Sequence, residues 1–199
     1  MEKESSFSNP QLSIKRSTSS MKDILGHYSI HSNTMALLPA NRMDYYTIVK
    51  EPDRDIYVKQ PPIELIKQAC LERFATYDGV REAVQHYTGF KRKVPIPINP
   101  HLNLYFFPTH ATNHFDCCWI SYYHVLRIEK SLTNHPSSTI LFKSGERLHL
   151  DVSPYILNRQ MKRTLKCFAV NLDFRVHAGG DPEVMRYHER NLYKRHLPN

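Results

Sequence analysis

The chain lacks long apolar runs and carries no apolar segment near its N-terminus. None of its 199 residues lies in an apolar stretch close to the roughly 20 residues that a membrane-spanning helix needs. The first ten residues, MEKESSFSNP, are polar and charged, unlike the apolar core of a secretion signal. We therefore expect a chain that is neither exported nor inserted in a membrane, and a cytoplasmic location.

Glycine and cysteine are also scarce. Six glycines provide no phosphate-cradling loop of the P-loop or dinucleotide-binding type, and no nucleophile elbow. The four cysteines include one adjacent pair, Cys117 and Cys118, which suits neither a disulfide framework nor a ribbon-type zinc site. We interpret them as reduced thiols. With these motifs absent, the sequence predicts a protein without enzymatic activity and without a cofactor.

Histidine, in contrast, is abundant. His110, His114, Cys117, Cys118 and His124 fall within fifteen positions. Zinc sites usually use two ligand pairs, each with a spacing of two to four residues, and here no second pair matches. We therefore predict no metal site, with Cys118 packed as a small apolar side chain. A zinc-dependent enzyme acting on nucleic acid is the alternative, and metal analysis of the purified protein tests it.

Positive charge is concentrated in the second half of the chain. Residues 1–90 carry 11 Lys and Arg against 11 Asp and Glu, whereas residues 91–199 carry 16 against 8, so the net +8 lies in the second half. Such asymmetry favours a polyanion partner, because each Lys or Arg that meets a phosphate releases counterions. The alternative is a generally basic, solvated surface.

Apolar patterns predict the elements. Strands are expected at 35–38, 45–49, 56–58, 102–107, 119–128, 139–142 and 147–152, the last two forming a hairpin around Ser144-Gly145. A helix begins at Pro61-Pro62 and ends in a turn at Asp78-Gly79. Its apolar stripe comprises Ile63, Ile66, Cys70 and Phe74. The stretch 81–87 is ambiguous between helix and strand.

Two more helices are expected towards the C-terminus. One begins at Ser153-Pro154, with a serine N-cap and an apolar stripe. That stripe comprises Leu157, Met161, Leu165 and Phe168. The other begins at Asp181-Pro182-Glu183. Because hairpin-length connections dominate, we predict an α+β fold, mainly antiparallel β-sheet, with one helix between strands and one or two C-terminal helices. Residues 1–26 are expected to be a disordered tail, 27–175 the folded domain and 176–199 a basic helical tail.

Two basic clusters are the candidate nucleic-acid-binding residues. Lys91, Arg92 and Lys93 precede the extended run VPIPINP, where a loop could enter the minor groove of A·T-rich DNA. The second cluster, Arg159, Lys162 and Arg163, lies off the apolar stripe of the helix that begins at Ser153. No helix-turn-helix pattern is apparent, because neither candidate helix follows a partner helix and a short turn.

A series of short motifs extends over much of the chain. The central block from Lys93 to Ile120 contains Lys93-Val94-Pro95-Ile96, Asn99-Pro100, Phe107-Pro108-Thr109, Cys117 or Cys118, and Trp119-Ile120-Ser121. Flanking motifs are Met35 to Pro39, Cys70, Thr76-Tyr77, Gly79, Phe142 to Gly145, Val152-Ser153, Gln160 and Arg163-Thr164. In order and spacing they resemble the ComK family of competence transcription factors, over about residues 34 to 168.

The resemblance implies a DNA-binding activator of DNA-uptake genes that binds double-stranded A·T-rich promoter boxes through the minor groove. It also implies a homo-oligomer, RNA polymerase as a partner, and control by a proteolytic adaptor. The family's adaptor-binding stretch has no clear equivalent here, the arginine after Gly79 is displaced to Arg81, and the N-terminal extension is long. The alternative is a paralogue that binds DNA poorly and modulates an active regulator by association.

Overall fold

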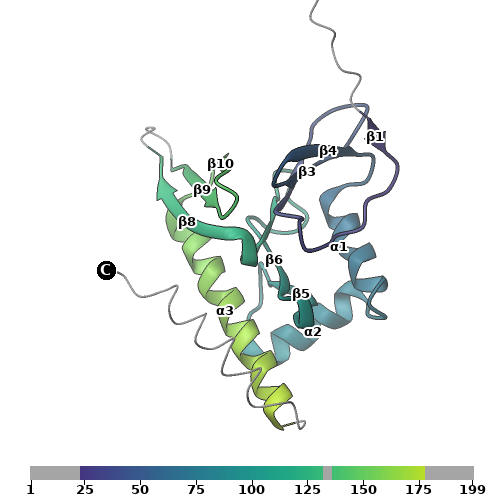
Figure 1. The fold of residues 1–199 in the computed structure, drawn as a ribbon. Helices are drawn as coiled ribbons and strands as arrows, with labels where there is room; N and C mark the ends of the chain where they lie inside the picture. Colours follow the sequence, from purple (N-terminus) through teal and green to yellow (C-terminus); the bar gives the residue numbers. More distant parts are fainter. Residues whose placement is uncertain (1–22, 132–135, 178–199) are drawn as a thin grey trace, which may run out of the picture.

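The computed structural model describes residues 23–131 and 136–177, and its fold is α+β (Figure 1). The first half contains β1 (Ile24–Leu25), β2 (Ala36–Pro39), β3 (Thr47–Glu51), β4 (Arg54–Val58), α1 (Pro62–Leu71) and α2 (Tyr77–Thr88). The second half contains β5 (Ile96–Asn99), η1 (Pro100–Leu102), β6 (Leu104–Pro108), β7 (Trp119–Ser121), η2 (Tyr122–His124), β8 (Val125–Lys130), β9 (Ser138–Phe142), β10 (Arg147–Leu150) and α3 (Pro154–His177). The predicted class is confirmed.

The strands form two sheets. A seven-stranded sheet has the order β1-β4-β3-β2-β7-β6-β5, and a three-stranded sheet has the order β10-β9-β8. Neighbouring strands are antiparallel except β1 and β4. The hairpin of β9 and β10 around Ser144-Gly145 is confirmed, with Leu141 opposite Arg147. Short connections between neighbours in sequence account for most of the pairing.

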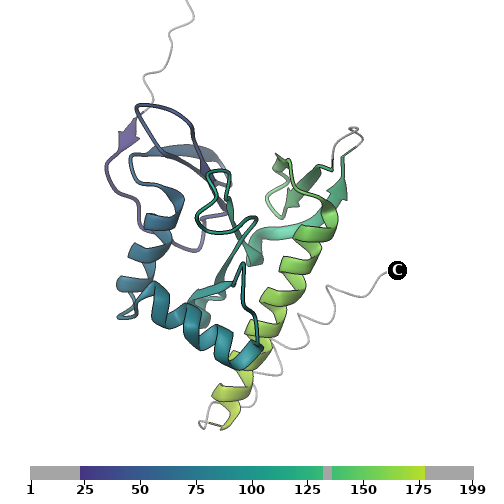
Figure 2. The same cartoon turned by 180° about the vertical axis from the view of Figure 1, so that it is seen from behind.

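The seven-stranded sheet is covered on both faces near β6 and β7. All five residues of β6 are buried, and successive side chains point to opposite faces. Phe106 and Trp119 pack in the apolar cluster with α1, whereas Phe107 and Ile120 pack with the three-stranded sheet and the start of α3. Figures 1 and 2 show α1 on one side of β5 and β6 and α3 on the other, while α2 extends from α1 towards α3, where Val84 packs with Phe168.

The helix expected from Pro61 to Asp78 is two helices. Phe74 is fully exposed and has a positive φ of 58°, so it lies outside the apolar stripe. The Thr76 side chain caps α2 by accepting the Gly79 N–H at 3.1 Å, and Asp78-Gly79 therefore belongs to the first turn of α2. The ambiguous stretch 81–87 is helical, and α2 ends at Gly89 with a φ of 74°.

The strand expected over 119–128 is divided between the two sheets. Trp119 and Ile120 pair with β6, the chain turns through η2, and Val125 begins β8 of the three-stranded sheet. An aromatic and β-branched run does not show where the chain changes sheets, because both strands have the same composition. The helix expected at Asp181 lies outside the described residues, as do residues 1–22 of the tail expected at 1–26. Within the remainder of that range, Ile24 and Leu25 form β1 and pair with β4.

Candidate nucleic-acid interface

The first basic cluster lies on the loop that joins α2 to β5. Gly89 ends α2 in the left-handed conformation, and Lys91 and Arg92 are exposed. Lys93 has a positive φ of 50°, an uncommon value for a residue with a side chain. Val94 is then buried at the start of the run leading into β5. The loop is therefore short and held at both ends by packed structure.

The second basic cluster lies on α3, whose first turn is capped by Ser153. The Ser153 hydroxyl accepts the Ile156 N–H at 3.4 Å. The fully covered face of α3 includes Leu157 and Phe168 of the predicted apolar stripe. The other two members, Met161 and Leu165, are half-buried and line a groove beside β8. The face that packs on the rest of the molecule comprises Leu157, Gln160, Thr164, Cys167 and Phe168. Hydrophobicity alone missed the two polar members of this face.

Five of the six predicted site residues meet in one pocket. Loop residues Lys91, Arg92 and Lys93 and helix residues Arg159 and Arg163 line a cavity of about 510 Å³ between the loop and α3, which we call the basic pocket. Its other lining residues are Gly89, Phe90, Tyr155, Ile156 and Gln160. No acidic side chain lines it. The sixth residue, Lys162, points elsewhere and shares the groove beside β8 with Arg127.

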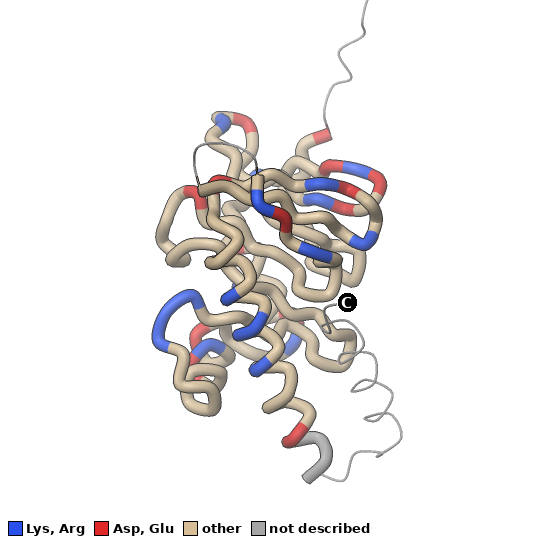
Figure 3. The backbone as a smooth tube through the Cα atoms, turned by 90° about the vertical axis from the view of Figure 1, so that its left-hand side faces the viewer, with Lys and Arg blue, Asp and Glu red and all other residues tan. Residues whose placement is uncertain are grey.

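The charge distribution agrees with this placement. Figure 3 shows Lys and Arg along α3 and on a loop at its side in the lower half of the molecule, with few acidic positions between them. Over the strands in the upper half, acidic and basic positions alternate, as in the ion pairs of Lys50 with Asp55 and Glu146. Such pairing cancels the field locally, whereas the basic pocket keeps its positive potential.

The cations of the basic pocket divide into two kinds. The Arg163 guanidinium lies 4.2 Å from the Phe90 ring centroid and donates hydrogen bonds to the Arg92 carbonyl and Gln160 Oε1. Burial, together with the charge of Arg159, lowers the pKa of Arg163. The Lys93 ammonium donates to the Thr109 carbonyl at 2.9 Å. Both side chains are thus engaged within the protein.

Lys91, Arg92 and Arg159 are of the other kind. All three are exposed, and no residue in the described part of the chain accepts a hydrogen bond from their side chains. Their charges therefore face solvent and are available for phosphate oxygens or base edges. Reasoning from sequence did not separate these three from Lys93 and Arg163, because both kinds carry the same charge.

Two further residues belong to this site and were not predicted as part of it. Gln160 is 2% exposed and lies against the loop, and Lys166 donates to the Thr88 carbonyl at 3.1 Å while lying over the Phe90 ring. Gln160 belongs to a motif of the sequence, and neither it nor Lys166 is among the six predicted site residues. Their contacts join positions 67 and 78 residues apart, so no local signal indicates them.

The helix pair α1–α2 does not supply a competing basic surface. The two helices are joined by a short turn, a helix pair that the sequence did not predict because the stretch 81–87 was ambiguous. The exposed side chains of α2 include Asp78 and Glu82, which offset its arginine, Arg81. The exposed face of α2 therefore has no excess of positive charge for phosphate groups, unlike the basic pocket.

The histidine and cysteine cluster forms no metal-binding geometry among residues 23–131 and 136–177. His110 and His114 stack with ring centroids 4.8 Å apart, and Cys117 and Cys118 are both buried. Burial raises the pKa of the Cys118 thiol to about 12, which disfavours the reactive thiolate. Across the same described residues, no helix is long and apolar enough to cross a membrane.

A family model described as ComK protein matches residues 25–175. The chain belongs to the ComK family. Among ComK relatives, the competence transcription factor of Bacillus subtilis (strain 168) is 27% identical over 142 residues, which cover 70% of this chain and 72% of that protein. No solved structure matches the chain. The matched region contains the loop at Lys91, the whole of β5 to β10, and most of α3.

Proposed function

We propose that this chain is a ComK-like transcription activator of DNA-uptake genes that binds A·T-rich promoter DNA through the minor groove. The observation that carries the proposal is the basic pocket, where two basic segments distant in sequence meet without an acidic neighbour. Membership of the ComK family, and a relative named as a competence transcription factor, support the same function. A regulator of this kind needs a DNA-binding surface and no catalytic centre.

The exposed side chains suggest how the DNA is held. The minor groove is about 6 Å wide and narrower in A·T-rich tracts, where its negative potential attracts arginine. Arg92, on a short loop, enters this groove, while Lys91 and Arg159 contact the phosphates at its edge. Lys162, which faces the groove beside β8, contributes a phosphate contact only where the DNA continues past α3.

We further propose that residues 27–175 form the DNA-binding domain and that the protein acts in the cytoplasm as a homo-oligomer with RNA polymerase as its partner. Two-fold related copies would read two neighbouring A·T boxes, as symmetric DNA-binding dimers do. A proteolytic adaptor is a further partner suggested by the family resemblance. These assignments follow the family and are independent of the details of the basic pocket.

An electrophoretic mobility shift with the full chain tests the DNA-binding proposal. The probes are an A·T-box promoter fragment and a G·C-rich fragment of equal length, each at two salt concentrations. We expect Arg92→Ala to weaken A·T binding about 10-fold or more and to reduce the preference over G·C, as loss of a groove contact does. Arg159→Ala should weaken binding to both fragments and reduce the salt slope by about 1.

Arg73→Ala is the matched control, because Arg73 is exposed in the turn between α1 and α2, away from the basic pocket. Equal binding of both fragments by the parent, lost together at moderate salt, would reduce the interaction to non-specific attraction. A folded parent that binds neither fragment but co-purifies with a second regulator would favour the modulator alternative.

A further inference from the structure

Carbonyl groups of the loop beside the basic pocket, and of the last residue of α2 before it, accept hydrogen bonds from side chains. There are four such bonds: Lys166 donates to the Thr88 carbonyl, Gln85 to the Lys91 carbonyl, Arg163 to the Arg92 carbonyl and Gln160 to the Lys93 carbonyl. Three of these donors come from α3. A loop on the surface normally leaves such groups to water, so this arrangement gives the loop one defined shape.

Gln160 is the central member of this set. Its buried amide nitrogen donates to the Lys93 carbonyl at 3.0 Å and to the Pro108 carbonyl, at the end of β6, at 2.8 Å. Its amide oxygen accepts from Arg163 at 3.0 Å. One side chain thus joins α3, the loop and the sheet. A carboxylate could not donate to the two carbonyls, and an apolar side chain could make none of these bonds.

The backbone at Lys93 is what allows two consecutive carbonyls to reach the same helix. In an extended segment, successive carbonyl groups point to opposite sides, so the carbonyls of Arg92 and Lys93 would point apart. The positive φ of Lys93 turns the chain so that Arg163 and Gln160 each engage one of them. With these carbonyls directed to α3, Lys91 and Arg92 are the exposed side chains of the loop.

We infer that Gln160 and Arg163 are positioning residues that hold the loop 90–93 in the shape that presents Lys91 and Arg92 to DNA, and that neither contacts DNA itself. This inference rests on the proposed function and changes the role of Arg163 from a phosphate contact to a clamp. It also gives a physical meaning to the motif of Gln160 and Arg163-Thr164. Fixing the backbone of one residue lowers an equilibrium constant roughly 5–30-fold through lost conformational entropy. A loop that is already ordered before binding avoids this loss and therefore binds DNA correspondingly tighter.

Gln160→Met tests the inference, because methionine has a similar length and removes no charge. Two quantities are measured on the full chain: hydrogen exchange of the backbone amides at 90–94, and affinity for the A·T fragment over a range of salt. We expect faster loop exchange, about 10-fold weaker binding and a salt slope reduced by about 1, although the variant keeps every cation. A merely structural role would lower stability without changing the slope.

Thr164→Val is the matched control. Thr164 is also buried on α3, and the variant loses one hydrogen bond, from the Thr164 hydroxyl to the Gln160 carbonyl, which does not involve the loop. It should leave loop exchange and the salt slope as in the parent. If Gln160→Met does not fold, Arg163→Lys replaces it, since lysine keeps the charge but loses the two-pronged contact with Arg92 and Gln160.

Each outcome tests a different step of the inference. Unchanged loop exchange in Gln160→Met would show that the side chain does not hold the loop. Faster exchange with unchanged affinity and salt slope would show that loop order is irrelevant to DNA binding. Either result overturns the inference. A parent chain that does not bind the A·T fragment overturns the proposed function instead, and the exchange comparison then still decides whether Gln160 holds the loop.

Discussion

At the scale of single residues, Phe74 occupies a position that usually requires glycine. The Phe74 N–H donates to the Leu71 carbonyl at 3.0 Å and the Ala75 N–H to the Cys70 carbonyl at 3.2 Å, which is the Schellman arrangement at the end of α1. The φ of 58° costs an L-residue about 1–2 kcal/mol. The Phe74 ring is fully exposed, so no burial of apolar surface offsets this conformational cost.

We expect Phe74→Gly to raise the free energy of unfolding by about 1 kcal/mol, which corresponds to about 2–4 °C in Tm. Ala75→Gly is the control, because the φ of Ala75 is not positive and glycine there should lower stability by about 0.5–1 kcal/mol. Thermal unfolding of both variants beside the parent measures the effect. A lower Tm for Phe74→Gly would show that the phenylalanine ring makes a stabilising contact that its exposure does not indicate.

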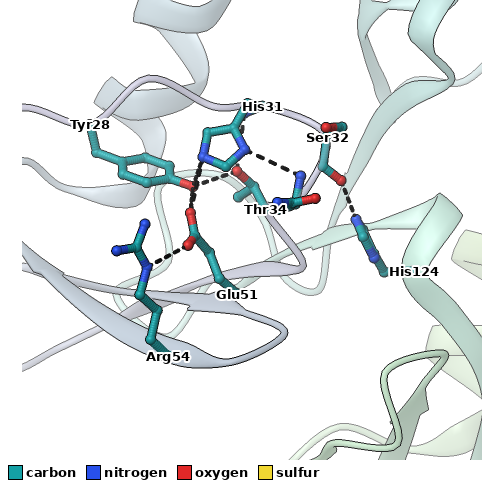
Figure 4. A network of polar contacts seen from close by, with 8 residues as sticks. Tyr28, His31, Ser32, Thr34, Glu51, Arg54 and His124 are labelled. Atoms are coloured by element: carbon teal, nitrogen blue, oxygen red, sulfur yellow. Dashed lines mark hydrogen bonds and ion pairs between the residues drawn. The ribbon is translucent and has the colours of Figure 1, made fainter.

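At the scale of elements, a buried carboxylate fastens the segment between β1 and β2. Glu51, at the end of β3, accepts hydrogen bonds from the Tyr28 hydroxyl and from Arg54, both at 2.8 Å, and lies 3.0 Å from His31 (Figure 4). Burial raises the pKa of Glu51, but the hydrogen bonds from Arg54 and Tyr28 outweigh it and the net pKa is lowered. The same segment reaches η2, because His124 donates to the Ser32 carbonyl.

Glu51→Gln should lower the free energy of unfolding at neutral pH by about 2 kcal/mol, because an amide cannot accept all the hydrogen bonds of this buried carboxylate. Chemical denaturation measures the loss. Glu64→Gln is the control, since Glu64 forms an exposed pair with Lys67 on α1 that should contribute at most about 0.5 kcal/mol. Equal losses in the two variants would contradict the special role of Glu51.

The pH dependence follows from the lowered pKa of Glu51. A carboxyl group whose pKa is lower in the folded chain than its usual 4.5 stabilises the fold above that pH. The stabilisation is lost as the pH falls through the pKa that Glu51 has in the folded chain, because the carboxylate is then protonated and loses its charge. The stability difference between the parent and Glu51→Gln should therefore be full at neutral pH and shrink below 4.5. A difference that persists down to about pH 2 would contradict this.

At the scale of the whole molecule, the DNA-binding proposal depends on two segments acting as one surface. The Arg163 guanidinium and the Arg92 carbonyl are 71 positions apart in sequence and in direct contact in the fold. A double-mutant cycle on DNA affinity measures whether the side chains of α3 affect DNA binding by holding the loop 90–93. If Gln160 acts by holding Arg92 in place, its removal matters less once Arg92 is already alanine.

We therefore expect Gln160→Met and Arg92→Ala to be non-additive, with a coupling of about 0.5–3 kcal/mol. Arg92→Ala and Lys162→Ala form the control pair, because Lys162 lines the groove beside β8 and shares no partner with the loop. Their effects should add within about 0.5 kcal/mol. Additive losses for Gln160 and Arg92 would mean that the glutamine affects DNA binding by a route other than the loop.

Local patterns predicted several elements well. The hairpin around Ser144-Gly145 and the start of α3 at Ser153-Pro154 were identified, because turn and capping residues act on their own neighbours. The break after Leu71 was missed, because Phe74 in the left-handed conformation carries no glycine signal. The division of 119–128 was missed because strand composition says nothing about which sheet a strand joins.

By itself, the sequence determined the concentration of positive charge after residue 90, the identity of the two basic clusters and the family. These are properties of residue type and order along the chain. Tertiary structure alone decided which of these cations face solvent, namely Lys91, Arg92 and Arg159. It also decided that Lys93 and Arg163 donate hydrogen bonds to carbonyl groups of the protein. The physical reason is that equal charges differ in role only through their partners, and here those partners come from distant segments that meet when α3 packs against the loop.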